Sequence, residues 1–240
     1  MFGKWLRKRP RHTSDFAAPS PDSAFIALGD IHGRLDLLER ALQNADLPVI
    51  CVGDYIDRGD QSAEVLRCLQ ARPEVTCLMG NHEEMMLNFL AQPVRHGPRW
   101  LRNGGLQTLA SFGIARISDS AEGKNLTAAR DALAEALGPE LLRWVGTLPT
   151  CHRNGNIAIL HAGADPQLPI DAQSRDTLLW GHPEFRRMPR SDGIWVLHGH
   201  TIVDAPRAQD GVISIDTGAY ATGRLTAARI DGEGVSFSSV

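Results

Sequence analysis

Three Gly-polar pairs stand at similar positions in the first third of the chain: Gly29-Asp30, Gly53-Asp54 and Gly80-Asn81. Each pair directly follows a short apolar run, so each is expected where a buried strand ends. The carboxyl ends of strands in an open α/β sheet face the crevice in which ligands bind, so the three side chains should converge there. Convergent oxygen donors of this kind are suited to a metal ion.

Histidines extend this donor set. His32 stands in the first turn, and His161 and His200 stand at the ends of two later apolar runs. The predicted ligand set is Asp30, His32, Asp54, Asn81, His161 and His200. Carboxylate, imidazole and amide donors suit Mn, Fe, Zn or similar ions, and the absence of thiolates argues against a structural zinc site. Six ligands are too many for one catalytic ion, but two ions that share Asp54 would leave room for water and substrate.

The second and third turns also carry groups that can act on a phosphate ester. Arg58 in the second turn can hold phosphate oxygens with a bidentate fork, and Asn81 in the third turn is assigned to phosphate binding as well as to the metal. His82 can give a proton to the leaving oxygen, and Asp57 can orient its imidazole. Taken singly, Asp57 would be interpreted as a carboxylate at a helix N-terminus and Arg58 as a solvated charge. Their pairing with His82 favours catalysis.

The elements that must position these groups are βα units. Apolar runs at 24–30, 49–54 and 75–81 lead into helix-like stretches at 35–45, 62–71 and 83–91, which predicts parallel strands with crossover helices. Residues 93–149 are interpreted as a helical insertion, with a turn at Gly104-Gly105 and a helix over 125–138 that ends at Gly138 and Pro139. Strand-like runs return at 156–163, 193–200, 211–219 and 223–230, and their Gly-rich turns predict antiparallel pairing in a second sheet.

The whole sequence limits the class of protein. A chain of 240 residues is expected to form one domain over 23–240, preceded by a flexible basic tail at 1–22. The net charge of −3 gives no general attraction to nucleic acid. The stretch MFGKWLRKRPRH lacks the apolar core of a signal peptide, and contact of this tail with an anionic membrane is a lesser alternative to solvation. Four cysteines without a C-x-x-C pair suit a reducing cytoplasm.

Five ordered motifs carry a family resemblance: GDIHG at 29–33, GDYIDRG at 53–59, GNHE at 80–83, HAG at 161–163 and HGHT at 198–201. The chain resembles the phosphoprotein phosphatase family of calcineurin-like metallophosphoesterases, in particular its bacterial branch of serine/threonine protein phosphatases and diadenosine tetraphosphatases. The resemblance implies a four-layer α-β-β-α sandwich with two mixed sheets flanked by helices.

The resemblance also divides the ligands between two divalent ions, for which Mn is the first expectation and Fe, Zn and Ni are alternatives. It implies that Asp30, His32 and His200 hold one ion, that Asn81 and His161 hold the other, and that Asp54 bridges them. His82 would be the general acid, Asp57 its partner and Arg58 a phosphate clamp. His198 would then lie outside the ligand set.

One position departs from the family pattern. Members commonly carry a second phosphate-binding arginine just past a tryptophan, and here that position, after Trp180-Gly181, is His182. Either His182 takes that role, or Arg186 or Arg187 reaches in, or the phosphate is held less strongly, since imidazole lacks the bidentate fork of guanidinium.

The resulting expectation is a cytoplasmic serine/threonine protein phosphatase that hydrolyses phosphomonoesters of proteins or small molecules by attack of a metal-bridging hydroxide. The first alternative is a symmetrical dinucleoside polyphosphate hydrolase, with Trp100 and Arg102 of the insertion walling the cleft. The second is a phosphoprotein-binding module of low activity. The retained ligands and the Asp57 and His82 pair argue against this second alternative.

Overall fold

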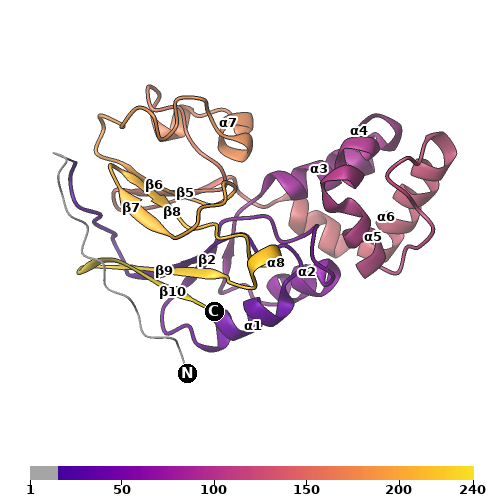
Figure 1. The fold of residues 1–240 in the computed structure, drawn as a ribbon, viewed down its shortest axis with the longest axis horizontal. Helices are drawn as coiled ribbons and strands as arrows, with labels where there is room; N and C mark the ends of the chain where they lie inside the picture. Colours follow the sequence, from indigo (N-terminus) through magenta and orange to yellow (C-terminus); the bar gives the residue numbers. More distant parts are fainter. Residues whose placement is uncertain (1–15) are drawn as a thin grey trace.

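The computed structural model describes residues 16–240, which form two stacked five-stranded sheets with helices outside them (Figure 1). The first sheet has the order β10-β9-β1-β2-β3 and the second the order β4-β5-β6-β8-β7. The strands are β1 (Phe25–Leu28), β2 (Val49–Cys51), β3 (Thr76–Cys77), β4 (Cys151–Asn154), β5 (Ile157–Leu160), β6 (Trp195–His198), β7 (Arg207–Gln209), β8 (Val212–Ser214), β9 (Thr226–Asp231) and β10 (Gly234–Ser239).

The helices are α1 (Leu35–Gln43), α2 (Ser62–Gln70), α3 (Asn81–Ala91), α4 (Pro93–Trp100), α5 (Leu106–Ser111), α6 (Gly123–Gly146), α7 (Arg175–Trp180) and α8 (Ala219–Thr222). A π-helical turn, η1 (Leu101–Gly105), joins α4 to α5, and a 3-10 turn, η2 (Ile170–Ala172), precedes α7.

Alternation along the strands explains the layers. In β1, Phe25 and Ala27 face the second sheet, whereas Ile26 and Leu28 face the helices, as the period of two in a strand requires. The core between the sheets includes Ile159 and Leu197 from the second sheet. A separate apolar cluster covers the outer face of the second sheet beneath α7. These layers confirm the predicted sandwich of two mixed sheets flanked by helices.

The three early βα units form as predicted. β1 pairs in parallel with β2, and β2 with β3, and the helices α1, α2 and α3 follow the three strands in turn. Every residue of β1 and β2 is buried, which agrees with their unbroken apolar runs.

The predicted antiparallel second sheet is wrong in its central part. β5 pairs in parallel with β6, and β6 with β8, while antiparallel pairing is confined to the edges, β4 with β5 and β7 with β8. The run at 223–230 forms β9, which joins the first sheet beside β1. The Gly-rich turns were a poor guide because the connections between the central strands are long crossovers, not hairpins.

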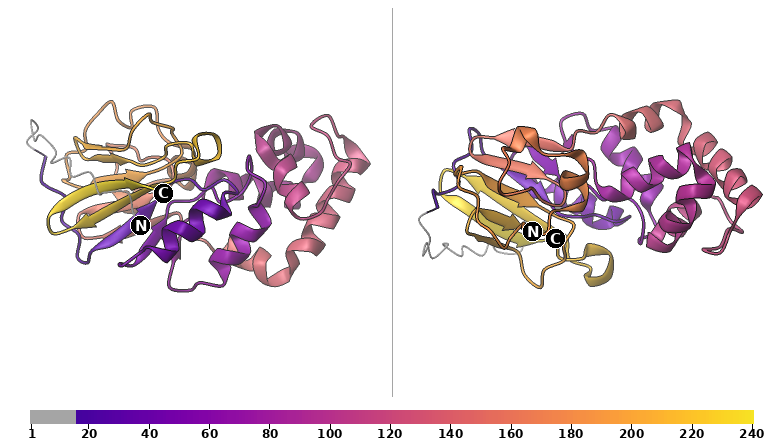
Figure 2. Two further views of the ribbon diagram at one scale, coloured as in Figure 1. Left: turned by 60° about the horizontal axis from the view of Figure 1, so that its bottom comes forward. Right: turned by 90° about the horizontal axis from the view of Figure 1, so that it is seen from above.

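Helices α4, η1, α5 and α6 occupy the predicted insertion and form a lobe beside the sheets, seen from three directions in Figures 1 and 2. The predicted end at Gly138 is a kink instead, with φ 71° and ψ 166°, after which the helical run resumes at Pro139 and ends at Gly146. The pair Gly104-Gly105 lies inside a helical run, where Gly104 adopts φ 109°. Proline suits the first turn of a helix, which explains why the helical run of α6 resumes at Pro139 after the kink at Gly138.

Residues 16–22, the last part of the predicted flexible tail, are in contact with the second sheet. The Phe16 ring packs edge-on against Trp195 at 5.5 Å, the Trp195 indole donates to Ala17 O at 2.7 Å, and Ser20 N donates to Asn156 Oδ1 at 2.7 Å. Residues 16–22 are therefore held against the second sheet, and the basic stretch before them lies outside the described residues. Within 16–240, no helix combines the length and the apolar character needed to cross a bilayer.

Candidate metal centre

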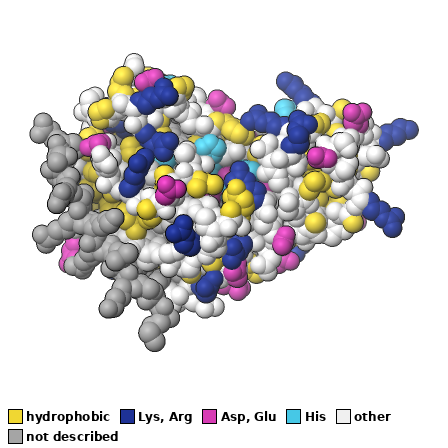
Figure 3. Space-filling view, in the orientation of Figure 1, with side chains coloured by type: hydrophobic (Ala, Val, Ile, Leu, Met, Phe, Trp, Pro, Cys, Tyr) yellow, Lys and Arg dark blue, Asp and Glu magenta, His cyan; other side chains and the backbone are white. Residues whose placement is uncertain are grey.

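The predicted ligands meet at one edge of the sandwich, where the carboxyl ends of the central strands of both sheets lie together. Asp30, Asp54 and Asn81 follow β1, β2 and β3, while His161 and His200 follow β5 and β6. Convergence from five separate chain segments depends on this parallel arrangement, because parallel strands end at the same edge. In Figure 3, histidine side chains reach the surface near the middle of the face shown, with lysine or arginine side chains close by.

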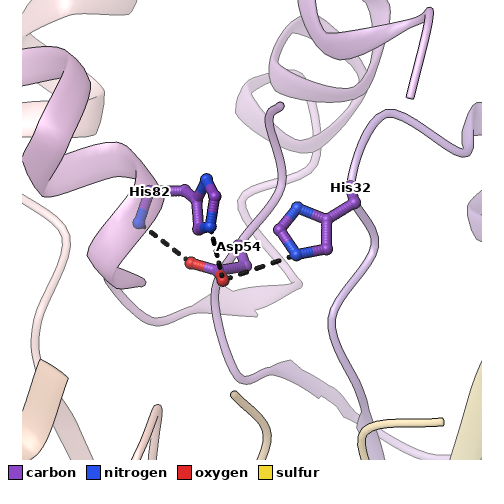
Figure 4. Close-up of side chains that lie close together, drawn as sticks. All are labelled: His32, Asp54 and His82. Atoms are coloured by element: carbon purple, nitrogen blue, oxygen red, sulfur yellow. Dashed lines mark hydrogen bonds and ion pairs between the residues drawn. The ribbon is translucent and has the colours of Figure 1, made fainter. Parts of the chain in front are cut away.

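The Asp54 carboxylate lies at the middle of the site. Its Oδ2 is 3.5 Å from His32 Nε2 and its Oδ1 is 3.4 Å from His161 Nε2. Two groups of potential ligand atoms share Asp54, one with His32 and His82 and the other with His161 and His200. Figure 4 shows the His32 and His82 rings both directed at the Asp54 carboxylate. One carboxylate between two imidazole groups is the arrangement that a bridging ligand needs.

Two of the imidazoles are fixed with their lone pairs toward Asp54. His32 Nδ1 donates to Ile56 O at 2.7 Å, and His161 Nδ1 donates to Val52 O at 3.1 Å. Burial lowers the pKa of His32 to about 3 and that of His161 to about 4, so both rings are neutral at pH 7. A neutral imidazole held through its other nitrogen is the form that binds a metal ion.

The oxygen donors are packed so closely that they favour a cation. His161 Nε2 lies 2.8 Å from Asn81 Oδ1, and His200 Nδ1 lies 2.9 Å from the same oxygen. Burial, and after it the Asp216 and Asp54 carboxylates, raises the pKa of Asp30, since like charges in a buried place oppose ionisation. A divalent ion among these atoms would relieve both the lone-pair contacts and the charge repulsion. The residues present therefore fit a binuclear cation site.

Asp30 lies next to the cluster but belongs to neither of the two ligand groups among the described residues. Its carboxylate accepts a hydrogen bond from His200 N at 3.0 Å. His82, which we expected only as an acid, does belong to one group, with its Nε2 3.8 Å from Asp54 Oδ2. Thus the geometry brings five of the six predicted ligands together, leaves Asp30 beside them, and adds His82 at the border of the set.

The Asp57 and His82 side chains form a buried pair. His82 Nδ1 lies 2.6 Å from Asp57 Oδ2, both side chains are buried, and Nε2 is left facing Arg58 Nη2 at 3.1 Å. Burial lowers the pKa of His82, but the carboxylates of Asp54 and Asp57 outweigh it and raise the pKa above its ordinary value. The arrangement can hold a proton on the imidazole near the site.

Arg58 joins the two histidines at the mouth of the site. Its Nη1 lies 3.0 Å from His32 Nε2, and its guanidinium lies 5.0 Å from the centroid of the Tyr220 ring. Tyr220, on α8, also contacts the His32 ring edge-on at 5.4 Å and is partly exposed. Sequence reasoning missed Tyr220 because nothing in its local pattern connects α8 to the first turns.

The backbone at the site is strained in the sense that non-glycine residues occupy the left-handed region. His32 has φ 44°, Asp54 52°, Asp57 70°, Arg58 69° and His200 60°. Each such residue costs on the order of 1 kcal/mol, and such strain persists only where surrounding contacts enforce it. This clustering agrees with a functional site.

Four residues at the site were missed by the sequence reasoning or assigned a different place. Glu83 accepts hydrogen bonds from Asp54 N, Tyr55 N and Gly80 N, which ties the second turn to the third; its position three residues after the helix-capping Gly80 was the available signal. The others are Asp216, Thr108 and Trp100.

Asp216 follows β8, so the same strand-end rule that found Asp30 could have found it. Trp100, expected in the cleft wall, is fully buried beside Asp57 instead, with Thr108 on the same carboxylate. Neither Trp100 nor Arg102 lines the cavities described below.

His182 lies apart from the carboxylate cluster but on a cavity that reaches it. This cavity, of about 590 Å³, is lined by His182, Arg186 and Arg187 together with His200 and Trp180. His182 Nδ1 accepts from Glu184 N at 3.3 Å, and its Nε2 lies 3.8 Å from Asp165 Oδ2. Both the histidine and the two arginines offered by the sequence therefore stand on one wall. His198, by contrast, is buried, with its Nε2 2.9 Å from Ser214 Oγ.

Comparison with known proteins agrees with this geometry. The serine/threonine-protein phosphatase 1 of Salmonella typhimurium (strain LT2) is 32% identical over 218 residues, covering 85% of this chain and 90% of that protein. The symmetrical bis(5'-nucleosyl)-tetraphosphatase of Methylococcus capsulatus is 30% identical over 149 residues, or 60% of this chain but only 44% of that protein. A solved structure provisionally assigned as a diadenosine tetraphosphatase superposes with a TM-score of 0.64 at 22% identity, covering 92% of this chain and 95% of that one, which supports the fold.

The family model described as calcineurin-like phosphoesterase matches residues 24–211, a range that begins beside β1 and contains every predicted ligand and the Asp57 and His82 pair. The chain therefore belongs to the calcineurin-like phosphoesterases and is a hydrolase that acts on phosphate esters.

Proposed function

We propose that this chain is a serine/threonine protein phosphatase that hydrolyses phosphomonoesters with two divalent metal ions, of which Mn is the first candidate. The observation that carries the proposal is the position of the Asp54 carboxylate between two groups of imidazole ligands. The near full-length match to a bacterial serine/threonine phosphatase supports the choice of substrate.

The proposed ligand division is the one that the family resemblance implies, and it differs from the distances at one residue, since His200 lies in the ligand group of His161. His32, His200 and Asp30 would hold one ion, Asn81 and His161 the other, and Asp54 both. When bound, such ions activate a water molecule for attack on phosphorus at neutral pH. Mn suits this mixture of carboxylate, amide and imidazole donors.

The chain's own groups would bind the ester and handle the proton. Arg58 is placed to donate to two phosphate oxygens, because its two terminal nitrogens already point toward the imidazoles of His32 and His82. His82 would deliver a proton to the leaving oxygen from Nε2, while Asp57 holds Nδ1 and keeps the ring in the required orientation. All of these groups except Arg58 are buried, so water is largely excluded from them.

The experiment is a Mn-reconstituted assay that compares p-nitrophenyl phosphate, a phosphoserine peptide and diadenosine tetraphosphate, with Asp54→Asn as the blank. We expect hydrolysis of the first two substrates and a loss of at least about a thousandfold in the variant, which lacks the shared charged ligand. The variant should also bind fewer Mn ions per chain. Activity that survives in Asp54→Asn, or silence of the wild-type protein on all three substrates, would overturn the proposal.

A dinucleoside polyphosphate hydrolase is the second candidate. The observation in its favour is the arginine-lined cavity beside His200, which is larger than a single phosphorylated side chain needs. The related tetraphosphatase from Methylococcus is longer than this chain, which spans less than half of it. Hydrolysis of diadenosine tetraphosphate in the same assay, without hydrolysis of the peptide, would select this candidate.

A further inference from the structure

Two cavities adjoin on the side of the second sheet that carries α7. The cavity of about 590 Å³ opens beside His200, and a second one of about 680 Å³ lies further from the ligands. Arg186, Arg187 and Arg207 line both of them, so these three side chains stand where the cavities meet. Arg207 comes from β7, about twenty residues after the two others in the chain, and the tertiary fold alone brings it to them.

The three arginines carry positive charge and form no ion pair among the described residues, although Asp210 lines the second cavity with them. All three are exposed, and within residues 16–240 none of their guanidinium groups takes part in an ion pair or a side-chain hydrogen bond. Arg190 nearby behaves differently: it is buried, paired with Asp192, and donates to Asp165 O and Leu168 O. Thus Arg190 supports the fold, whereas the other three are available to a ligand.

The cavity beside His200 is electropositive along its described wall. No Asp or Glu lines it among residues 16–240, although the protein as a whole carries a net charge of −3. Figure 3 shows several dark blue side chains over the second sheet, with magenta ones among them. Unpaired guanidinium groups with a common opening attract a polyanion, and their planar forks fit phosphate oxygens.

The cavity and the metal centre share His200. The Nδ1 of this residue lies 2.9 Å from Asn81 Oδ1, and its ring lies 5.1 Å from the His161 ring. A substrate whose scissile phosphate lies among the ligands can therefore extend past His200 toward the arginines. Arg58 lies next to His32 and His82 and lines neither cavity.

We propose that Arg187 and Arg207, with Arg186, bind a second phosphoryl group of the same substrate, so that the enzyme prefers esters with two or more phosphoryl groups to simple monoesters. This inference rests on the proposed function, since it concerns what enters the same site. The second group can be part of a nucleotide phosphate chain or a second phosphorylated residue of a peptide, and the chemistry of recognition is the same.

The test uses the double variant Arg187→Ala/Arg207→Ala. Arg186 is left unchanged because it adopts φ 68°, where any substitution also changes the backbone. The matched control is Arg143→Ala, an exposed arginine on α6 in the helical lobe, away from β7 and α7 (Figure 1). Four substrates are compared: p-nitrophenyl phosphate, peptides with one and with two phosphoserines, and diadenosine tetraphosphate.

We expect the double variant to hydrolyse p-nitrophenyl phosphate within about twofold of the wild-type rate, because that substrate has no second phosphoryl group. For a substrate that has one, kcat/KM should fall by about tenfold or more, mainly through KM, since each lost contact is a charge-assisted hydrogen bond. A fall confined to the doubly phosphorylated peptide identifies a peptide as the source, and one confined to diadenosine tetraphosphate identifies a nucleotide.

Equal falls on all substrates, or no fall on any of the polyphosphorylated substrates that the wild-type protein hydrolyses, would overturn the inference. If the wild-type protein hydrolyses none of the four substrates, the proposed function fails. Calorimetry in the absence of metal then tests separately whether the cavity binds polyphosphate. Tripolyphosphate should then bind the wild-type protein about tenfold more tightly than inorganic phosphate, and this preference should disappear in the double variant but not in Arg143→Ala. If the wild-type protein binds the two anions equally well, the cavity is not a site for a second phosphoryl group.

Discussion

The indole Nε1 of Trp100 donates a hydrogen bond to Asp57 Oδ2 at 3.0 Å, inside the protein. Thr108 Oγ1 donates to the other oxygen of the same carboxylate at 2.5 Å. Both donors belong to the helical insertion, whereas Asp57 belongs to the turn after β2. Because Asp57 in turn holds His82, the insertion fixes a side chain of the site from behind.

Trp100→Phe should therefore slow catalysis without removing any group that touches the substrate. The ring remains, but Asp57 loses one donor and holds His82 less firmly, so we expect kcat to fall roughly tenfold. If the effect passes through His82, kcat for phenyl phosphate should fall more than kcat for p-nitrophenyl phosphate, which has the better leaving group. Trp144→Phe on α6 is the control, and an equal fall for both esters would mean a general loss of structure.

Gly105→Ala should destabilise the protein by crowding Trp100. A Cβ at position 105 would lie 2.6 Å from the Trp100 ring, and such overpacking typically costs about 1–3 kcal/mol. Gly146→Ala is matched to it, since its Cβ would meet no atom within 4 Å, and it should leave stability unchanged or raise it by up to about 1 kcal/mol. Urea unfolding measures both free energies. Equal stabilities of the two variants would contradict the packing seen at Gly105.

His82→Gln should reveal the acid by its dependence on the leaving group. Loss of a general acid typically lowers the rate by about 10²–10⁴-fold, and we expect this for phenyl phosphate. 2,4-Dinitrophenyl phosphate should suffer much less because its leaving group needs no proton. Since His82 also borders the ligand group of Asp54, the number of Mn ions bound per chain should be counted. A loss of one ion would show that His82 is a ligand instead.

His182→Arg should lower KM for p-nitrophenyl phosphate with little change in kcat. His182 is half-buried on the cavity that His200 also lines, so a guanidinium there can reach toward the phosphate and donate through a fork that imidazole lacks. His152→Arg on β4 controls for the added charge. A KM that is unchanged or higher would argue that position 182 lies too far from the scissile phosphate.

Asp192→Asn should reduce stability only where the carboxylate is ionised. Burial raises the pKa of Asp192, but the hydrogen bonds from Arg190 and from Ile194 N outweigh it and bring the pKa below 3.8. A lowered carboxyl pKa contributes stability that is complete above the unfolded value and is lost as the pH falls through the folded value. The difference in Tm between wild type and variant should thus be constant near neutral pH and vanish in strong acid. Asp119→Asn, which changes an exposed carboxylate, is the control; a difference that persists in strong acid would contradict the role of the charge.

Local sequence was sufficient for the first half of the site. The strands at β1 and β2, the helices after them, and the positions of Asp30, Asp54 and Asn81 all follow from apolar runs that end in Gly-polar pairs. The physical reason is short range: burial of consecutive residues defines a strand, and the βα connection defines which end of the sheet carries the turn. The location of the helical insertion could be predicted for the same reason.

Only the tertiary structure decided the contacts between segments that are far apart in the chain. The pattern at 223–230 was compatible with either sheet, and only the packing of both faces placed β9 beside β1. Trp100 and Thr108 reach Asp57 across more than forty residues, and Arg207 reaches Arg186 and Arg187 from another strand. Such contacts depend on how whole helices and strands pack against one another. Each residue contributes only weakly to this packing, and the spacing of apolar residues within one segment does not encode it. The sequence by itself therefore predicted the candidate ligands and determined the reaction class. The fold decided what holds the Asp57 and His82 pair and which arginines lie beside His200.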